Sequence, residues 1–345
     1  MKKVIIVILF SLCILFAINY GSEVVKADKP MILGYTLGST NSDKSLTSFN
    51  EYFNTIATDT FSFDKNGNLI GEAPKEQLSY AKKKKINTYA VISNFGEQDF
   101  DADLAHQVMT DKLVKNRFIK QVAKVAEDKD NGYTGVNIDL EAVYPEDRIN
   151  LSSLIKDISV VLHKKQLKLM VSVPAKTNDD KDNTWTWPYD YKKIGNYADY
   201  IQVMTYDEHG SWGNPGSLVS MKWLEDTLSY STNNIKAGKV IMGIPAYGYD
   251  WNLTDANRNR MVQWDEIQEL IKSNKIKPTY NKKTDSVMFN YLDKNKQEHI
   301  VWYENETTIE KKTKLLKKYK LGGVSVYALG NETETFWGAI QNGVK

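Results

Sequence analysis

The 345-residue chain has the composition of an ordinary globular protein and a nearly balanced charge. Hydrophobic residues make up 41% and charged residues 26% of the chain, and 45 basic against 43 acidic residues leave a net charge of +2. This balance argues against a nucleic-acid-binding protein with a broad basic face. One cysteine excludes a disulfide scaffold or a cysteine-rich zinc site, and the four histidines lie too far apart for metal-ligand spacing.

The N-terminus has the pattern of a secretory signal peptide. Two lysines precede an apolar run over residues 4–18, which is short for a membrane span of about 20 residues. Val25-Lys26-Ala27 then fits a small-residue cleavage site. We predict a signal peptide over 1–27 and a secreted or envelope-associated mature chain over 28–345 with no stable membrane span. An uncleaved N-terminal anchor is the alternative.

Short β-rich segments alternate with longer amphipathic ones along the rest of the chain. The predicted strands are Met31–Thr36, Thr60–Phe63, Thr88–Ser93, Gly135–Leu140, Leu167–Val173, Tyr200–Thr205, Val240–Pro245 and Gly323–Leu329. Helical patterns lie between them at 112–125, 151–162, 223–230 and 308–319. About eight β–α pairs in one chain predict an α/β fold of the TIM (β/α)8 barrel type.

One stretch interrupts this alternation between the seventh strand and its helix. Residues 286–291 and 299–302 have strand patterns joined by a turn at 293–296, and 264–271 has a helical pattern. We therefore predict a small α+β insertion over 247–305. A long loop without structure of its own is the alternative.

The fourth predicted strand carries the residues most typical of catalysis. In the run from Gly135 to Glu141, the polar residues Asn137, Asp139 and Glu141 alternate with apolar ones, so they share one face of the strand. In a barrel that face points inward and opens at the active-site end. Burial and like charge would raise the pKa of one carboxyl group, as a general acid requires. The alternative is a strand end whose carboxylates pair with lysines or cap the next helix.

The same run resembles the signature of glycoside hydrolase family 18, an Asp-Gly-x-x-Asp-x-Asp-x-Glu strand. It matches at Gly135, Asp139 and Glu141, and departs at Thr134 and at Asn137, where the pattern commonly has Asp. Segments 202–207, 242–251 and 322–330 are similar to the family's sixth, seventh and eighth strands, in the correct order.

The resemblance covers almost the whole mature chain and is closest to the bacterial spore-germination and cortex-lytic N-acetylglucosaminidases. Segments 144–148 and 105–108 are similar to that group. The resemblance therefore implies a catalytic barrel over 28–345. It also implies a bacterial protein of the medium or the cell envelope, with the spore as one such location.

This family implies a substrate-assisted, retaining mechanism. Glu141 would protonate the glycosidic oxygen and later act as the base on water. Asp139 would orient the N–H of the substrate's 2-acetamido group, whose oxygen attacks the anomeric carbon, and the Tyr206 hydroxyl would hold that oxygen. The substrate must carry an N-acetyl group beside the bond that is cleaved, and the chemistry needs no metal and no organic cofactor.

Further residues are candidates for the substrate-binding site. Gln202 and Asp207 would line the floor, or belong to a hydrogen-bond network at the strand ends. Met204 fits the site floor or barrel packing equally well, and Tyr35 could line the same pocket. Other candidates concern sugar stacking and the orientation of Asp139. They are Tyr327, where the family usually has Trp, the cleft candidates Trp212 and Trp302, and Asn137, which can still orient Asp139.

The leading functional hypothesis is a secreted glycosidase that cleaves β-1,4 bonds after N-acetylglucosamine. The expected partner is a polysaccharide containing that sugar, either peptidoglycan of the spore cortex or chitin, and the expected state is a monomer. One alternative is a chitolectin-like binding protein, against which the presence of Glu141 argues. Another is an endo-β-N-acetylglucosaminidase acting on N-glycans.

Overall fold

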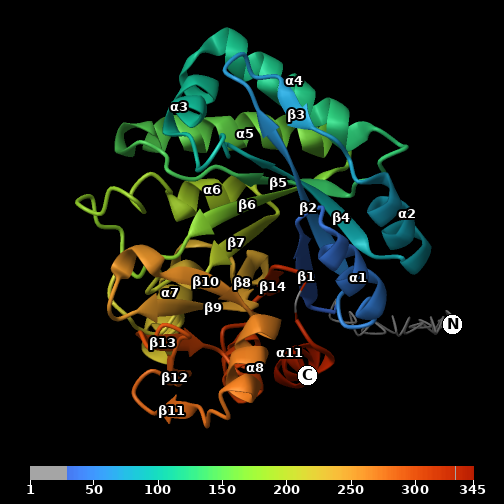
Figure 1. The fold of residues 1–345 in the computed structure, drawn as a ribbon. Helices are drawn as coiled ribbons and strands as arrows, with labels where there is room; N and C mark the ends of the chain where they lie inside the picture. Colours follow the sequence, from blue (N-terminus) through green and yellow to red (C-terminus); the bar gives the residue numbers. More distant parts are fainter. Residues whose placement is uncertain (1–28, 331) are drawn as a thin grey trace, which may run out of the picture.

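A computed structural model of the protein describes residues 29–330 and 332–345 (Figure 1). The signal peptide predicted over 1–27 lies outside these residues and remains a prediction. Within the described part of the chain, no helix is both long and apolar enough to cross a lipid bilayer.

The centre of the molecule is a closed barrel of parallel strands. Each strand pairs in parallel with the next, and the last pairs with the first, which closes the sheet. The barrel strands are β1 (Met31–Thr36), β2 (Thr55–Phe63), β4 (Asn87–Ser93), β5 (Gly135–Asp139), β6 (Lys168–Pro174), β7 (Tyr200–Met204), β8 (Val240–Pro245) and β14 (Gly323–Tyr327). The short β3 (Leu69–Gly71) pairs antiparallel with β2 outside the barrel. The TIM-barrel prediction is confirmed.

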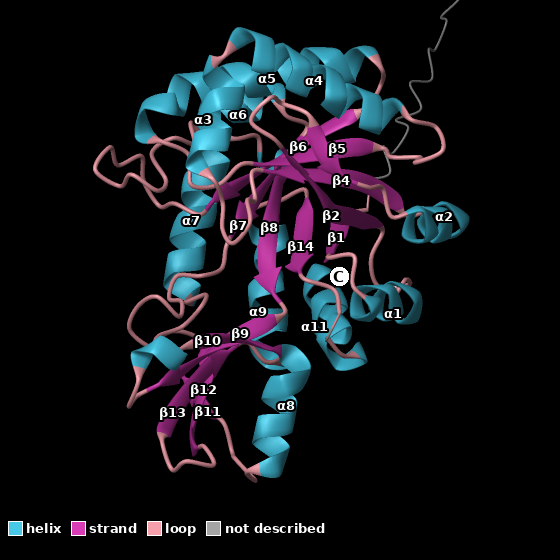
Figure 2. Cartoon of the chain, turned by 45° about the horizontal axis from the view of Figure 1, so that its top comes forward, coloured by secondary structure: helices cyan, strands magenta, loops and turns pink. Residues whose placement is uncertain are grey.

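Helices connect these strands and surround the barrel (Figure 2). They are α1 (Thr40–Ser48), α2 (Lys75–Lys84), α3 (Ala102–Thr110), α4 (Lys112–Glu127), α5 (Arg148–Lys164), α6 (Tyr191–Tyr197), α7 (Met221–Asn234), α9 (Glu306–Thr313), α10 (Leu315–Lys318) and α11 (Glu334–Val344). Polar side chains cap several of them. Asp111 accepts hydrogen bonds from the first-turn backbone of α4, and Ser220 accepts one in α7.

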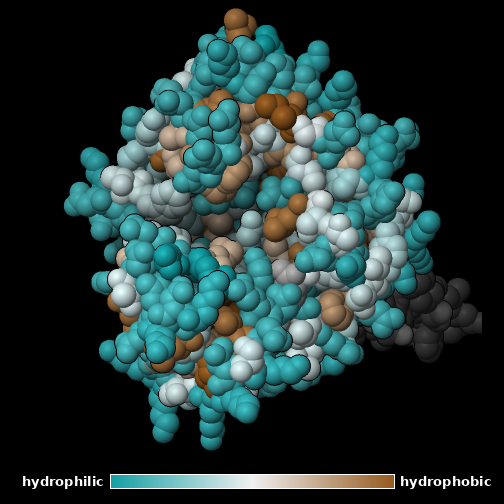
Figure 3. Space-filling model, viewed as in Figure 1, coloured by the Kyte–Doolittle hydropathy of each residue, from teal (hydrophilic) through white to brown (hydrophobic). Residues whose placement is uncertain are grey.

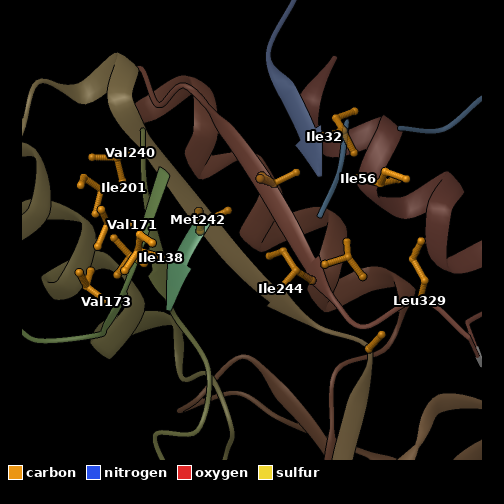
Figure 4. Close-up of a cluster of buried hydrophobic side chains, with 14 of the residues drawn as sticks. Ile32, Ile56, Ile138, Val171, Val173, Ile201, Val240, Met242, Ile244 and Leu329 are labelled. Carbon is orange, nitrogen blue, oxygen red and sulfur yellow. The ribbon is translucent and has the colours of Figure 1, made fainter. Parts of the chain in front are cut away.

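Alternation along the strands separates an apolar outer side from the barrel interior. Figure 4 shows outer residues such as Ile56, Ile138 and Met242, which are at most 2% exposed and pack in the core between strands and helices. The interior holds a smaller apolar cluster that includes Leu33, Ala57 and Val91. On β5, Asp139 is the last residue, so this polar side chain lies at the carboxyl end of the strand, as the sequence predicted.

The predicted insertion is present and has more strands than its sequence pattern indicated. It forms an antiparallel sheet in the order β10-β9-β13-β12-β11, with α8 (Trp264–Ser273) beside it (Figures 1 and 2). Its strands are β9 (Tyr247–Asn252), β10 (Arg260–Gln263), β11 (Thr279–Asn281), β12 (Ser286–Leu292) and β13 (Glu298–Tyr303). The β12–β13 hairpin and α8 were predicted, whereas β9, β10 and β11 were not.

Several predicted boundaries differ from the structure by one or more residues, and two of the differences concern the start of a strand and the division of a helix. The second barrel strand begins at Thr55 rather than Thr60, and a register shift between Asp59 and Phe61 interrupts its regular pairing with β4. The helix predicted over 308–319 is divided at Lys314 into α9 and α10.

Candidate active site

A cavity of about 970 Å³ lies at the carboxyl ends of the barrel strands. This volume is at the upper end of the range for small-molecule sites. Nine of the predicted site residues line it, namely Tyr35, Asp139, Glu141, Gln202, Met204, Tyr206, Asp207, Trp212 and Tyr327. Figure 3 shows that the face of the molecule seen in Figure 1 is hollowed between the α3–α5 side and the inserted sheet.

Asn137 lies beneath this cavity rather than in its wall. It is fully buried, and its Oδ1 accepts a hydrogen bond of 2.6 Å from the Tyr35 hydroxyl. Its Nδ2 donates to the Ser172 hydroxyl at 2.9 Å and to the Ile138 carbonyl at 3.2 Å. Ser172 in turn hydrogen-bonds Asp139, which offsets a small part of the rise that burial causes in the pKa of that carboxyl group. Asn137 is thus an anchor below Asp139, without an exposed face for substrate.

Asp139 ends β5 and lines the cavity, and one oxygen of its carboxyl group lacks a partner among the described residues. Its Oδ1 is buried and accepts no hydrogen bond from the described residues. Burial, with the nearby charge of Asp59, raises the pKa of Asp139 to about 7. A buried carboxylate oxygen without a donor is costly, so this atom is suited to accept an N–H from a bound ligand.

Glu141 follows β5 and is fixed through its backbone. Asn94, which follows β4 and is fully buried, accepts a hydrogen bond from the Glu141 N–H and donates one to the Glu141 carbonyl, each at 2.8 Å. Burial and the charges of Asp139 and Asp207 raise the pKa of Glu141 well above its ordinary value. A raised pKa favours the protonated form of a carboxyl group, which is the form a general acid requires.

Tyrosine rings form the floor beside these carboxyl groups. The Tyr206 and Tyr327 rings stack with centroids 6.2 Å apart, and Tyr35 lies 5.8 Å from Tyr327. Gly243 on β8 leaves room for this arrangement, because a Cβ there would lie 2.7 Å from the Tyr206 ring. Burial raises the pKa of Tyr206 well above its ordinary value, so its hydroxyl stays a neutral donor.

The remaining floor residues have both site and network contacts. The Asp207 carboxylate accepts a 2.7 Å hydrogen bond from the Tyr247 hydroxyl, and burial raises the pKa of Asp207 to about 6. Gln202 is 1% exposed and donates to the Ser325 hydroxyl at 3.2 Å. Met204 lines the cavity from the end of β7. Asp207 and Gln202 therefore both line the cavity and belong to a hydrogen-bond network at the strand ends, which the sequence had left as alternatives.

The two predicted tryptophans have different positions. Trp212 is 72% exposed and lines the cavity, with its ring edge-to-face against Tyr249 at 5.8 Å. Trp302 is 7% exposed, lies on β13 opposite Tyr249 and Met288, and is not among the lining residues. The expectation that Trp302 lies in the cleft is not met, because the inserted sheet buries it in its own core.

Several lining residues were not selected from the sequence. Asp59 lies on β2, Ser172 on β6, and Phe95 in the loop after β4, while Trp185 comes from the loop after β6. Trp223, the first residue of the helical pattern predicted over 223–230, also lines the cavity from the first turn of α7. The available signals were a charged residue inside a β-rich run for Asp59 and a loop tryptophan for Trp185.

The arrangement places two carboxyl groups with raised pKa values and a tyrosine hydroxyl around one cavity. These are the groups that acid-assisted cleavage of an acetamido sugar requires, with exposed aromatic rings beside them for sugar faces. Over residues 29–330 and 332–345, no group of three or more histidine, cysteine or acidic side chains could hold a metal ion.

Comparison with known proteins agrees with this chemistry. Residues 31–332 match the family described as Glycosyl hydrolases family 18. The chain belongs to glycosyl hydrolase family 18. As a member of this family it is a glycosidase, and the resemblance noted in its sequence is confirmed.

Relatives of this family 18 glycosidase include proteins of two named activities. It is 56% identical to "Uncharacterized glycosylase YvbX" of Bacillus subtilis (strain 168), over 91% of this chain and 92% of that protein. A crystal structure of a chitinase from Chromobacterium violaceum ATCC 12472 is 36% identical, with a TM-score of 0.86 over 91% of this chain and 99% of that one. The crystal structure of the Bacillus megaterium QM B1551 spore cortex-lytic enzyme SleL is 25% identical, with a TM-score of 0.84 over 92% of this chain and 74% of that one.

Proposed function

We propose that this glycosidase cleaves β-1,4 bonds after N-acetylglucosamine by a substrate-assisted, retaining mechanism. The observation that carries the proposal is the pair formed by Asp139 and Glu141: a buried acceptor without a donor next to a carboxyl group whose pKa is raised by burial. Glu141 donates its proton to the glycosidic oxygen as the bond to the leaving sugar breaks. The bond-breaking electron pair stays with the leaving oxygen.

The substrate's own acetamido oxygen is the nucleophile in this scheme. It attacks the anomeric carbon and forms a cyclic oxazolinium ion, while the acetamido N–H donates to the free Oδ1 of Asp139. The Tyr206 hydroxyl donates to the acetamido oxygen and orients it. Water then opens the ring, giving its proton to the Glu141 carboxylate, so the configuration at the anomeric carbon is retained.

The charge of the cavity favours a neutral glycan. Its lining contains the carboxyl groups of Asp59, Asp99, Asp139, Glu141 and Asp207, and, among the residues that the structure describes, no lysine, arginine or histidine. A free lactyl carboxylate on muramic acid would meet carboxyl groups there and no cationic side chain among the described lining residues. Chitin and the uncharged lactam form of muramic acid carry no such group, so we propose these as the sugars that fit.

Between the two polymers, we propose spore-cortex peptidoglycan as the substrate and chitin oligomers as the second candidate. Similarity to a spore cortex-lytic enzyme supports the first, and the higher identity to a bacterial chitinase supports the second. The exposed Trp212 and Trp185, 72% and 50% accessible, offer stacking surfaces that suit either polymer. Secretion to the cell envelope or the medium and action as a monomer belong to the same proposal.

The test is mass spectrometry of the products formed by residues 28–345 and by the matched variant Glu141→Gln. The substrates, in parallel, are spore-cortex fragments, chitin oligomers and an N-glycosylated peptide. Cleavage after N-acetylglucosamine in cortex, absent with Glu141→Gln, would support the proposal, and a ladder from chitin alone would make the enzyme a chitinase. Cleavage of the glycopeptide alone would favour an endo-β-N-acetylglucosaminidase, and binding without any product would favour a lectin.

A further inference from the structure

The loop between β6 and α6, residues 175–190, contains no helix or strand and brings Trp185 to the cavity. Trp185 is 50% exposed there. Loops of this length without secondary structure are uncommon in compact domains and often serve a function. An exposed ring on such a loop binds a sugar face well only if the loop is already ordered, because ordering it on binding costs conformational entropy. The contacts that order this loop therefore bear on substrate affinity.

Arg148, the first residue of α5, joins the two limbs of this loop. Its guanidinium group donates to both carboxylate oxygens of Asp179, at 3.1 and 2.7 Å, a bidentate geometry that lysine does not reproduce. The same group donates to the Trp187 carbonyl and lies over the Trp187 ring, 4.0 Å from its centroid. Trp185 lies between positions 179 and 187 in the chain, so Arg148 closes the segment that carries it.

Lys176 supports the same segment from beneath the loop. Its side chain is almost fully buried, and its ammonium group donates to the Asp179 carboxylate at 2.8 Å and to the Tyr189 carbonyl at 2.5 Å. Burial acts to raise the pKa of Asp179, but the hydrogen bonds and charges of Lys176 and Arg148 outweigh burial and lower that pKa. Asp179 is therefore ionised at neutral pH and accepts from both cations.

Both ends of this arrangement are fixed to the part of the barrel that carries the proposed general acid. The Tyr189 hydroxyl, from the same loop, donates at 2.7 Å to the carbonyl of Leu140, the residue before that acid. Asp147, which precedes Arg148, hydrogen-bonds His106 of α3 at 2.7 Å. Asp147 and His106 belong to the two segments that resemble the cortex-lytic group. Their contact fixes the start of α5, and with it the position from which Arg148 reaches the loop.

We propose that Arg148 is a positioning residue for substrate affinity: by tying the two limbs of the loop together, it holds the Trp185 ring as a preformed platform for one sugar unit of a long, neutral glycan. The inference rests on the proposed function for the nature of the ligand. The order of the loop does not depend on a ligand, so it can be measured without one. Lys181, an exposed residue between Asp179 and Trp185, is a trypsin site that reports it.

The first experiment is limited trypsin digestion of residues 28–345 without ligand, followed by mass spectrometry of the fragments that end at Lys181. Arg148→Ala should raise the rate of this cleavage by at least about ten-fold, because the loop opens more often. Arg148→Lys should also raise it, since lysine keeps the charge but not the bidentate pair. The matched control is Arg117→Ala, which removes an arginine that donates to the Asn66 carbonyl outside the cavity lining and should leave the rate unchanged. An unchanged rate in folded Arg148→Ala would overturn the inference.

The second experiment measures binding of chitin hexasaccharide and of spore-cortex fragments by calorimetry in the inactive Glu141→Gln background. Trp185→Ala should weaken binding by about five-fold and Arg148→Ala by about three-fold. Because Arg148 acts through Trp185, adding Arg148→Ala to Trp185→Ala should weaken binding by less than about 1.5-fold.

A further three-fold loss in the double variant would overturn the inference, since Arg148 would then affect binding independently of Trp185. If neither glycan binds while cleavage after Lys181 is still faster in Arg148→Ala, the proposed function fails and the ordering of the loop by Arg148 is confirmed.

Discussion

The side-chain amide of Asn94 forms two hydrogen bonds to Glu141, and both are to the backbone of that residue. Its Oδ1 accepts from the Glu141 N–H and its Nδ2 donates to the Glu141 carbonyl, both at 2.8 Å. Nδ2 also donates to the Asp101 carbonyl at 2.9 Å, which ties the following loop to the same point. Glu141, the proposed general acid, is therefore held in place from the end of the neighbouring strand.

Replacing Asn94 by Ala should lower kcat by about 10²-fold, because small displacements of a catalytic group are costly. It should also destabilise the fold by about 2–4 kcal/mol, since the Glu141 N–H and carbonyl lose buried partners. Steady-state kinetics well below the melting temperature, together with a urea titration, measure the two effects separately. An unchanged kcat in a folded Asn94→Ala enzyme would show that the clamp does not position the acid.

The raised pKa of Glu141 makes a prediction about stability. A carboxyl group whose pKa is higher in the folded than in the unfolded chain does not lower the free energy of unfolding at low pH, where it is protonated in both the folded and the unfolded chain. The cost appears as pH rises above the ordinary value of 4.5 and is complete above the folded pKa. Glu141→Gln should therefore raise the melting temperature at pH 8, by at least about 2 °C, and change it little at pH 4. Equal shifts at both pH values would contradict burial of this charge.

Tyr206→Phe removes the hydroxyl assigned to the acetamido oxygen and leaves the ring in place. We expect kcat to fall by about 10²-fold with a small change in KM, as for the loss of one donor to a developing charge. The matched control is Tyr52→Phe, which removes a hydroxyl bonded to Glu334 outside the cavity lining. If kcat is retained in Tyr206→Phe, the acetamido oxygen is held by another group.

Trp212→Ala should weaken binding of long oligomers without slowing the chemical step. Its ring is 72% exposed at the cavity, so its loss removes stacking worth about 1 kcal/mol, which raises KM by roughly five-fold. The control is Leu113→Ala, another exposed apolar side chain, located on α4. Comparison of di- and hexasaccharide substrates measures the effect; an equal KM for wild type and variant on the hexasaccharide would remove Trp212 from the binding site.

The barrel was predictable because its strands are nearly continuous apolar runs between amphipathic segments. Met31–Thr36 and Val240–Pro245 match the observed β1 and β8 residue for residue. The strand β9 was missed because its six buried residues, Tyr247–Asn252, mix glycine and polar groups with aromatics. Their burial comes from tertiary packing against β10 and β13, which periodicity along one strand does not encode.

The candidate site was predictable where a residue's role depends on its position along one strand, and not where it depends on a neighbour. Asp139 and Glu141 follow from alternation along β5. Asp59 depends on a register shift between β2 and β4, and Trp302 depends on which face of the inserted sheet is covered. Both are set by contacts distant in sequence.

The most direct test of the account is the anomeric configuration of the first product. Proton NMR of a chitin tetrasaccharide cleaved by residues 28–345, recorded before mutarotation, reports that configuration. Attack by the acetamido oxygen followed by water predicts the β anomer, with no cleavage of the de-N-acetylated tetrasaccharide. An α anomer, or comparable cleavage of the de-N-acetylated substrate, would contradict substrate assistance and with it the roles assigned to Asp139 and Tyr206.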